Sequence, residues 1–471
     1  MLFNSLTFLL FFSAVYVSYR ALGKWPKLQN RLLLIASYVF YGYWDWRFLF
    51  LIAASTALDY WLGSLIVQHP LQKRRILVTS VTFNLGLLFL FKYFNFFIEN
   101  FVVMMKGIGL DASSPALDIM LPLGISFFTF QKMTYISELY KGHLEARYDF
   151  LDFALFVCFF PLLLSGPIER ATSLLPQISK PRVMTADHIK EGIWLITWGL
   201  FQKVYIADNI APMVNKIFAP DWSGTGAEAL VGIYAYAIQI YCDFSGYTDI
   251  ARGVAKLLGF DIRLNFDLPY FATNPSDFWR RWHISLSSWL RDYVYIPLGG
   301  SREGEWRTAR NLFLTMVLVG LWHGAAWTFV LWGAYQGGLL ISYRLVARSA
   351  FRARWLPELG LVGKALAIIG MFHLTCLGWL LFRAQSVGQV VEFVSLIGGQ
   401  FAPGPAALTL LGSLLDYAAI LVVVHAIQQA RHTPLILQGV ALPIRGIVYG
   451  VLFYLMVLHG GVSDSFIYFQ F

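Results

Sequence analysis

Long apolar runs recur along this 471-residue chain and limit what it can fold into. A helix needs about 20 residues to cross the hydrocarbon core of a bilayer, and most of the runs approach that length. Helices satisfy their own backbone hydrogen bonds in lipid, and the alternating pattern of a barrel is missing. The sequence therefore predicts an all-α, polytopic membrane protein with one transmembrane domain over residues 1–471. The runs centre on residues 6–19, 31–43, 48–66, 76–98, 119–139, 150–165, 192–212, 228–250, 311–342, 364–382, 411–428 and 446–459.

The charged residues support this prediction and exclude other classes. They make up 13% of the chain, against about a quarter in soluble domains. The net charge of +9 is spread over short loops between the runs, as the positive-inside rule expects, so we predict lipid contact and no nucleic-acid partner. The three cysteines form no CxxC pair, which argues against a disulfide framework or a zinc site. No basic residue precedes the first run, so we expect a retained span rather than a cleaved signal peptide.

The most polar segment, residues 251–310, is predicted to lie on the cytoplasmic side. Within it we expect one amphipathic helix over about residues 275–296. Asn274 would cap its start, Pro275 would occupy its first position, and Pro297 would follow its end.

Two other runs raise questions of topology. The run 150–165 is short and is broken by Pro161, which favours a re-entrant segment that returns to the side it left. The run 311–342 admits two interpretations. A single span would place the basic loops 302–310 and 344–354 on opposite faces, whereas two half-depth helices that meet near Trp322–Trp332 would keep both inside.

Two histidines are the strongest candidates for chemistry. His323 lies in the run 311–342, and a helix starting near Asn311 would place its ring deep in the hydrocarbon layer. Desolvation there would keep the imidazole neutral and able to accept a proton, with Trp322 as a wall of the site. His283 lies on the predicted amphipathic helix, flanked at i±4 by Trp279 and Ser287. Each histidine also has a structural interpretation, as an interhelical hydrogen-bond partner or an interfacial side chain.

Charged side chains near these histidines are further candidates. Asp243 and Asp249 lie in or beside an apolar run, where a carboxylate needs a partner, so they could orient a histidine or pair with the arginines at 280–291. Arg280 and its neighbours could bind an anionic group, although a positive-inside loop would contain the same residues. The two histidines lack the spacing of a metal motif, and we expect no metal site.

Several long strings place the histidines in a family context. They are Leu121-Pro-Leu-Gly-Ile-Ser-Phe127, Tyr241-Cys-Asp-Phe-Ser-Gly-Tyr-Thr-Asp249, Phe278-Trp-Arg-Arg-Trp-His-Ile-Ser-Leu-Ser287, Trp289-Leu-Arg-Asp-Tyr293, Asn311-Leu-Phe-Leu-Thr-Met316 and Gly320-Leu-Trp-His-Gly-Ala325. With these strings the chain resembles the membrane-bound O-acyltransferase (MBOAT) family, and within it the bacterial alginate O-acetyltransferase branch.

The resemblance implies a multi-helix bundle with re-entrant and interfacial helices around a central funnel. The catalytic histidine of the family maps onto His323, and a second, supporting position onto His283. Substrate-binding positions are expected at Trp279, Arg280, Trp282, Ser287, Asp243, Asn311 and Trp322.

The same resemblance implies an activity and a cellular setting. An acetyl group would pass from a thioester donor, acetyl-CoA, to a hydroxyl of an exported polysaccharide such as alginate or cellulose, with no permanently bound cofactor. The protein would span the bacterial inner membrane several times. Its partners would be a periplasmic acetyltransferase of the SGNH-hydrolase type and the complex that makes and exports the polymer. Relatives that acylate teichoic acid or peptidoglycan leave the polymer open.

Two other classes compete with this interpretation. A proton-coupled transporter with a midplane histidine would show repeated halves with matching broken spans, which we do not find. A non-catalytic scaffold of a secretion complex would tolerate loss of the His323 imidazole.

Overall fold

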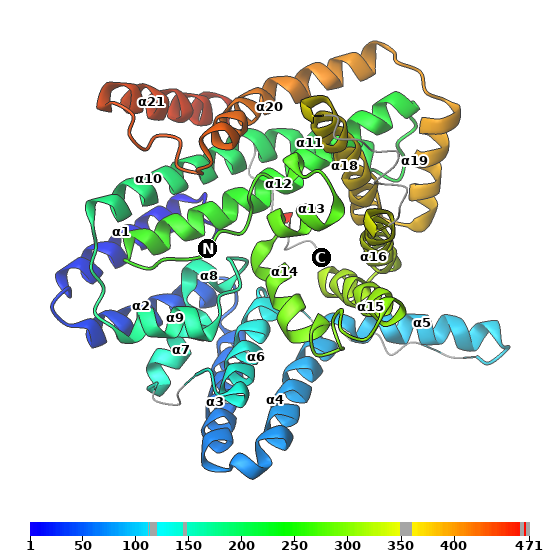
Figure 1. The fold of residues 1–471 in the computed structure, drawn as a ribbon. Helices are drawn as coiled ribbons and strands as arrows, with labels where there is room; N and C mark the ends of the chain where they lie inside the picture. Colours follow the sequence, from blue (N-terminus) through cyan, green and yellow to red (C-terminus); the bar gives the residue numbers. More distant parts are fainter. Residues whose placement is uncertain (112, 114–119, 145–147, 349–359, 462–465, 468–471) are drawn as a thin grey trace. The chain divides into compact units, whose positions relative to one another are not determined.

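The computed structural model describes the chain except for residues 112, 114–119, 145–147, 349–359, 462–465 and 468–471, so the end of the basic loop 344–354 lies outside the described residues. Within the described ranges the chain is helical and contains no strand, which confirms the predicted all-α polytopic class (Figure 1). Contacts divide it into two compact units. The first comprises Met1–Ile196 and Ile250–Arg263, and the second comprises Thr197–Asp249 and Leu264–Phe471.

Local sequence signals mark some of the helix ends in the first unit. Ser5 caps α1 by accepting a hydrogen bond from the Phe8 N–H, and Gly142 ends α6 in the left-handed region at φ 74°. The helices are α1 (Leu6–Ala21), α2 (Pro26–Gly42), α3 (Arg47–Gln68), η1 (Pro70–Gln72), α4 (Lys73–Leu88), η2 (Phe89–Tyr93), α5 (Phe94–Gly107), α6 (Ile125–Lys141), α7 (Phe150–Cys158), α8 (Phe160–Leu163) and α9 (Ala171–Ser179). Two further helices, α10 (Ala186–Leu200) and α12 (Gly226–Leu257), have residues in both units.

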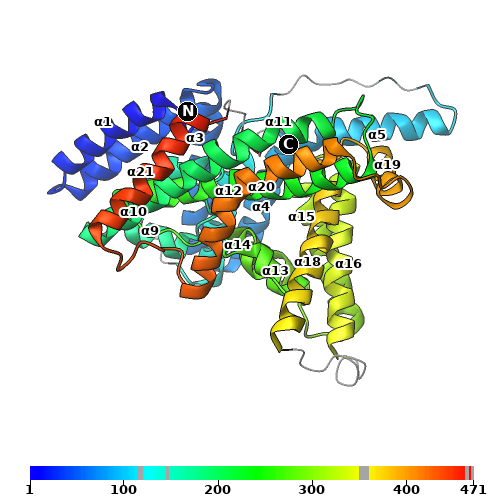
Figure 2. The same cartoon turned by 90° about the horizontal axis from the view of Figure 1, so that it is seen from above.

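The second unit contains the segments that carry the candidate histidines. Its helices are η3 (Phe201–Ala207), α11 (Asp208–Ile217), η4 (Pro269–Phe271), α13 (Pro275–Arg281), α14 (Ile284–Leu290), η5 (Arg291–Tyr295), α15 (Glu305–His323), α16 (Trp327–Arg348), α18 (Gly360–Arg383), α19 (Val387–Gly399), α20 (Pro405–Arg431) and α21 (Leu442–His459). Three of these, α15, α16 and α18, pack in sequence, so that α16 lies beside both of the others (Figures 1 and 2).

Five helical segments among the described residues are long and apolar enough to cross a membrane: Arg47–Gln68, Pro70–Gly107, Gly360–Arg383, Pro405–Arg431 and Leu442–His459. The run 150–165 is too short to do so. It forms α7 and α8, separated at Phe159, and the 9 residues of α7 rise only about 14 Å. The run is broken as predicted, but at Phe159 rather than at Pro161, which lies in the first turn of α8. The predicted return to the same side stays a prediction.

The first unit contains a fully buried ion pair. Asp59 on α3 and Lys132 on α6 approach within 3.5 Å, and neither side chain is exposed. Ser80 and Asn84 on α4 donate hydrogen bonds to the two oxygens of the same carboxylate. The buried carboxylate therefore ties three helices together, with a cation and two neutral donors around it.

The run 311–342 forms a hairpin rather than one span. The chain turns after His323, and α16 begins at Trp327. The helices pack closely because a Cβ at Gly320 would overlap the Phe329 carbonyl, and one at Gly333 would overlap the Met316 carbonyl. Helix α15 also begins at Glu305 rather than near Asn311, so the predicted start was six residues too late.

Candidate active site

The segment around His283 departs from the predicted continuous helix. α13 ends at Arg281, α14 begins at Ile284, and His283 adopts a left-handed backbone at φ 44°. The loop that precedes α13 causes the break by pairing with the helix backbone. The Asp267 N–H donates to the Arg281 carbonyl, and the Ile284 N–H donates to the Asn265 carbonyl. No local sequence pattern predicts this pairing, because the two segments meet only in the folded chain.

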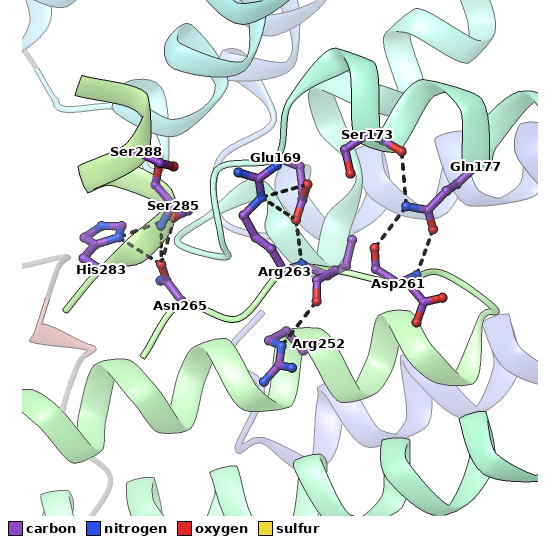
Figure 3. Close-up of polar contacts among 11 residues, drawn as sticks. Glu169, Ser173, Gln177, Arg252, Asp261, Arg263, Asn265, His283, Ser285 and Ser288 are labelled. Atoms are coloured by element: carbon purple, nitrogen blue, oxygen red, sulfur yellow. Dashed lines mark hydrogen bonds and ion pairs between the residues drawn. The ribbon is translucent and has the colours of Figure 1, made fainter. Parts of the chain in front are cut away.

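The Asn265 side chain fixes the His283 ring (Figure 3). Its Oδ1 accepts hydrogen bonds from the backbone N–H of Ser285 at 3.2 Å and from the Ser285 hydroxyl at 2.8 Å. The third neighbour is His283 Nδ1, also at 3.2 Å. Because a backbone N–H can only donate, this atom of Asn265 is the oxygen, and Nδ1 of His283 must donate to it. The proton therefore sits on Nδ1, and Nε2 is the basic nitrogen of the neutral ring.

The environment of His283 keeps the ring neutral. Its exposed fraction is 0%, and the rings of Phe244 and Phe266 lie 4.8 and 6.3 Å from it, centroid to centroid. Burial lowers the pKa of His283 to about 3, because the charged imidazolium is poorly solvated among these rings. At neutral pH the ring can accept a proton only when a compensating charge develops beside it.

His323 occupies a similar environment at the end of α15. It is the last residue of that helix and is 4% exposed. The rings of Trp332 on α16 and Phe382 on α18 each lie 5.1 Å from the imidazole. Trp332 stands perpendicular to it, at 90°. Three helices therefore enclose His323 in an aromatic shell that keeps bulk water away.

Trp322 connects the two histidines. Its ring lies 5.0 Å from the ring of His323 and 6.1 Å from the ring of His283, measured between centroids. Residues 40 positions apart in the sequence thus contact one indole, and both lie in the second unit. We call His283, His323 and Trp322 the histidine cluster.

Two other predicted residues extend this cluster. Trp282 is 1% exposed and packs against Phe266 at 4.9 Å and Trp379 at 4.7 Å. Trp279 contacts Trp332 at 5.9 Å, in an edge-to-face arrangement. The structure thus brings Trp279 and Trp282 into the aromatic wall around the cluster. Their contacts here are with other rings.

The remaining predicted residues take part in other contacts. Asn311 is buried and donates to the Gly300 carbonyl at 3.1 Å, which ties the preceding loop to α15. The Ser287 hydroxyl donates to the Trp282 carbonyl across the helix break. Arg280 is exposed. Ser287 also meets the histidine cluster through its backbone N–H, which donates to the His283 carbonyl at 2.9 Å, whereas no described contact joins Arg280 or Asn311 to the cluster.

The two aspartates belong to separate networks. Asp243 pairs with Lys203 at 2.9 Å, and Lys203 also pairs with Asp208 at 2.8 Å. The backbone N–H of Ile467 donates to the other oxygen of Asp243. Asp249 accepts a hydrogen bond from Gln202 at 3.4 Å. The partners predicted for these carboxylates, a histidine or the arginines at 280–291, are replaced by Lys203 and Gln202.

A cavity of about 310 Å³ lies next to the cluster within the second unit. Two of its walls, Tyr241 and Phe266, also pack against Trp282, and Phe266 contacts His283. The cavity is therefore one aromatic layer away from the His283 ring. Its lining is Trp198, Tyr241, Ser245, Asp249, Leu264, Phe266, Asp267, Leu268, Arg281, Gln428, Gln429, His432, Thr433 and Pro434.

Sequence reasoning missed several residues of this site. Asn265 lies 18 positions before His283 in a loop, and Trp379 and Phe382 come from α18. No local spacing connects them with the histidines. The available signal was compositional: a lone asparagine beside apolar residues, and two large rings near the end of an apolar run.

Comparisons with known proteins show which sequences this chain is similar to. The sequence profile of MBOAT, the membrane-bound O-acyltransferase family, matches residues 46–382, which include both histidines. The chain is 40% identical over 390 residues to a protein named probable alginate O-acetylase AlgI in Pseudomonas aeruginosa, covering 82% of this chain and 73% of the relative. It is 34% identical over 424 residues to a peptidoglycan O-acetyltransferase of Helicobacter pylori, covering 83% and 79%. A teichoic acid D-alanyltransferase of Bacillus subtilis is 31% identical over 276 residues, covering 56% and 69%.

Proposed function

Because this chain belongs to the membrane-bound O-acyltransferase family, we propose that it acetylates hydroxyl groups of an exported polysaccharide, with acetyl-CoA as the donor. The chain is a membrane-embedded O-acyltransferase. The choice of acetyl as the group and polysaccharide as the acceptor is supported by relatives named for alginate and peptidoglycan O-acetylation.

In the proposed reaction His323 is the general base. It takes the proton from the acceptor hydroxyl while the hydroxyl oxygen attacks the thioester carbonyl. The C–O bond forms, the C–S bond breaks, and the sulfur leaves as a thiolate that needs little acid assistance. The aromatic shell supports this role because it keeps bulk water from competing for the imidazole. His283, with its basic Nε2, acts as the second polar group of the site.

The donor and acceptor would enter from opposite sides of the membrane. The cavity beside Phe266 supports entry of the thioester donor, since it is polar and lies one ring away from His283. The acceptor would come from the periplasmic side of the bacterial inner membrane. It would be either the polymer itself or a periplasmic partner of the SGNH-hydrolase type that works with the export complex. Direct transfer is the simpler scheme, because Ser285, the serine beside the His283 ring, donates its hydroxyl to Asn265 and is not poised to relay an acyl group.

The observation that carries this proposal is the contact of two buried histidines with one tryptophan, at the positions where the family resemblance expects the catalytic pair. The test is acetyl analysis of the polymer exported by cells that depend on this chain. We expect His323→Ala to lower acetylation at least about 100-fold, the usual contribution of a general base. His69→Ala, at an exposed histidine, is the matched control and should leave acetylation unchanged.

Membrane insertion of each variant is verified on the same cells. Normal acetylation by an inserted His323→Ala variant would contradict the proposal and favour a scaffold role for the chain.

A further inference from the structure

A third buried histidine contacts the wall of the cavity. His425 on α20 is 6% exposed, and its Nε2 lies 3.2 Å from the hydroxyl oxygen of Tyr241 on α12. The two rings meet nearly edge to face, at 5.3 Å and 77°. This contact joins residues 184 positions apart within the second unit, and it fixes the direction of the tyrosine hydroxyl.

Tyr241 is the ring that links His425 to the site. It lines the cavity, and it also packs against Phe266 at 5.9 Å and Trp282 at 6.3 Å. Those two rings form part of the aromatic wall around the histidine cluster. A hydroxyl at this position therefore stands where the polar cavity meets the aromatic wall.

The shared hydrogen bond leaves Tyr241 with capacity for another partner. A hydroxyl has one proton to donate and two positions that accept. If His425 Nε2 carries a proton, it donates to the tyrosine oxygen, and the tyrosine O–H can donate to a ligand. If Nε2 carries no proton, the tyrosine O–H donates to it, and the tyrosine oxygen can still accept a hydrogen bond from a ligand. In both tautomers His425 orients a hydroxyl that can bind a further polar group.

The same helix provides a comparison. Tyr234 lies seven residues before Tyr241, two helical turns away, and its hydroxyl lies 2.8 Å from Nε2 of His373 on α18. This second pair is more exposed, and Tyr234 is not among the residues that line the cavity. One Tyr–His pair of α12 therefore borders the cavity, while the other is absent from the cavity lining.

We propose that Tyr241 is a donor-binding residue, whose hydroxyl hydrogen-bonds to the amide-rich arm of the thioester donor, and that His425 is the residue that positions it. This inference rests on the proposed function, because it assumes that the cavity receives the donor. An arm with several amides suits this cavity, because Gln428, Ser245 and Thr433 offer neutral hydrogen-bonding groups around Tyr241.

The test measures binding of coenzyme A to the purified full chain in nanodiscs by titration calorimetry, and the KM for acetyl-CoA in acetyl transfer. Loss of one neutral hydrogen bond should weaken binding about 3- to 10-fold. We expect this weaker binding for Tyr241→Phe, which keeps the ring and removes only the hydroxyl. Its KM for acetyl-CoA should rise in proportion, and its kcat should stay unchanged. His425→Leu should give the same loss, and the double variant should be no weaker than either single one. His425→Gln, which keeps a polar group near the tyrosine, should bind within about 2-fold of the unaltered chain.

Tyr234→Phe is the control for a purely structural effect, and it should bind coenzyme A like the unaltered chain. The inference is overturned if Tyr241→Phe binds coenzyme A as tightly as that control. It is also overturned if the fold-loss of affinity in the double variant equals the product of the fold-losses in the two single variants. If the unaltered chain binds no coenzyme A while polymer acetylation still depends on His323, both the donor identity and this inference fail, but the acetyl-transfer function stands.

Discussion

At the scale of single residues, the two histidines are held in place by different means. His323 is surrounded by rings from three helices, whereas His283 depends on one polar side chain, Asn265. The family strings pointed to both histidines and to Trp322, because those residues stand in the strings themselves. Asn265 could not be found in this way, since its role follows from how the loop before α13 pairs with the helix backbone.

The burial of His283 makes stability depend on pH. Its pKa is about 3 in the folded chain and 6.5 in the ordinary unfolded state. The unfolded state therefore binds a proton at a higher pH, so this contribution to stability is complete above pH 6.5 and is lost as the pH falls toward 3. At pH 5 the loss amounts to about 2 kcal/mol.

Unfolding of the detergent-solubilised chain at pH 7.5 and pH 5 measures this loss. The side chain of His283→Gln does not titrate in this range. Between the two pH values the stability of this variant should therefore fall by about 2 kcal/mol less than that of the unaltered chain. Equal decreases for the two proteins would show that His283 is solvated.

At the scale of elements, the hairpin of α15 and α16 decides where His323 lies. The sequence left one span or two helices open for 311–342, because an apolar run does not show where a turn interrupts it. In the structure Gly320 and Gly333 permit the close approach of the two helices. The structure shows what the approach requires: backbone carbonyls of Phe329 and Met316 occupy the space of the missing side chains.

A methyl group at Gly320 should force α15 and α16 apart. We expect Gly320→Ala to destabilise the chain by about 1–3 kcal/mol, because the obstacle is backbone and cannot rotate away. Acetyl transfer should fall as well, since His323 is three residues further along α15. Gly338→Ala on α16 is the control, because a Cβ there meets no atom within 4 Å. Thermal unfolding of both variants measures the difference, and equal effects would contradict the packing argument.

The buried ion pair of the first unit makes a second prediction for elements. Removing Lys132 leaves the Asp59 carboxylate buried without its cation, so we expect Lys132→Met to cost about 3–5 kcal/mol. Asp59→Asn combined with Lys132→Met removes both charges and should recover much of that loss. Unfolding of the two variants in detergent tests this. A double variant that is less stable than Lys132→Met would mean that the neutral donors Ser80 and Asn84 require the charge.

At the scale of the whole molecule, composition and run length were enough to predict an all-α polytopic protein. They were not enough to count its spans. Twelve runs were predicted, but only five described segments combine the length and hydropathy of a membrane-crossing helix, because polar residues such as Gln239 and Asp243 interrupt others like α12. The predicted single domain and central funnel stay predictions.

The hairpin predicts that the start of α15 and the end of α16 face the same side of the membrane. Helices α15 and α16 have 19 and 22 residues, so the chain returns to the side where α15 began. We expect cysteines introduced at Arg302 and at Val346 to react with a membrane-impermeant maleimide under the same conditions. Both should stay unlabelled in intact spheroplasts and react after permeabilisation. The three native cysteines are buried, which keeps the background low. Labelling of one position but not the other in intact spheroplasts would contradict the hairpin.

The two tyrosine–histidine contacts on α12 also have a mechanical consequence. They lie on the same side of the helix, two turns apart, and they fasten it to α18 at one level and to α20 at another. Two such contacts along one helix restrict both its rotation about its axis and its sliding along that axis. Within the second unit, sliding or rotation of α12 therefore requires both hydrogen bonds to break.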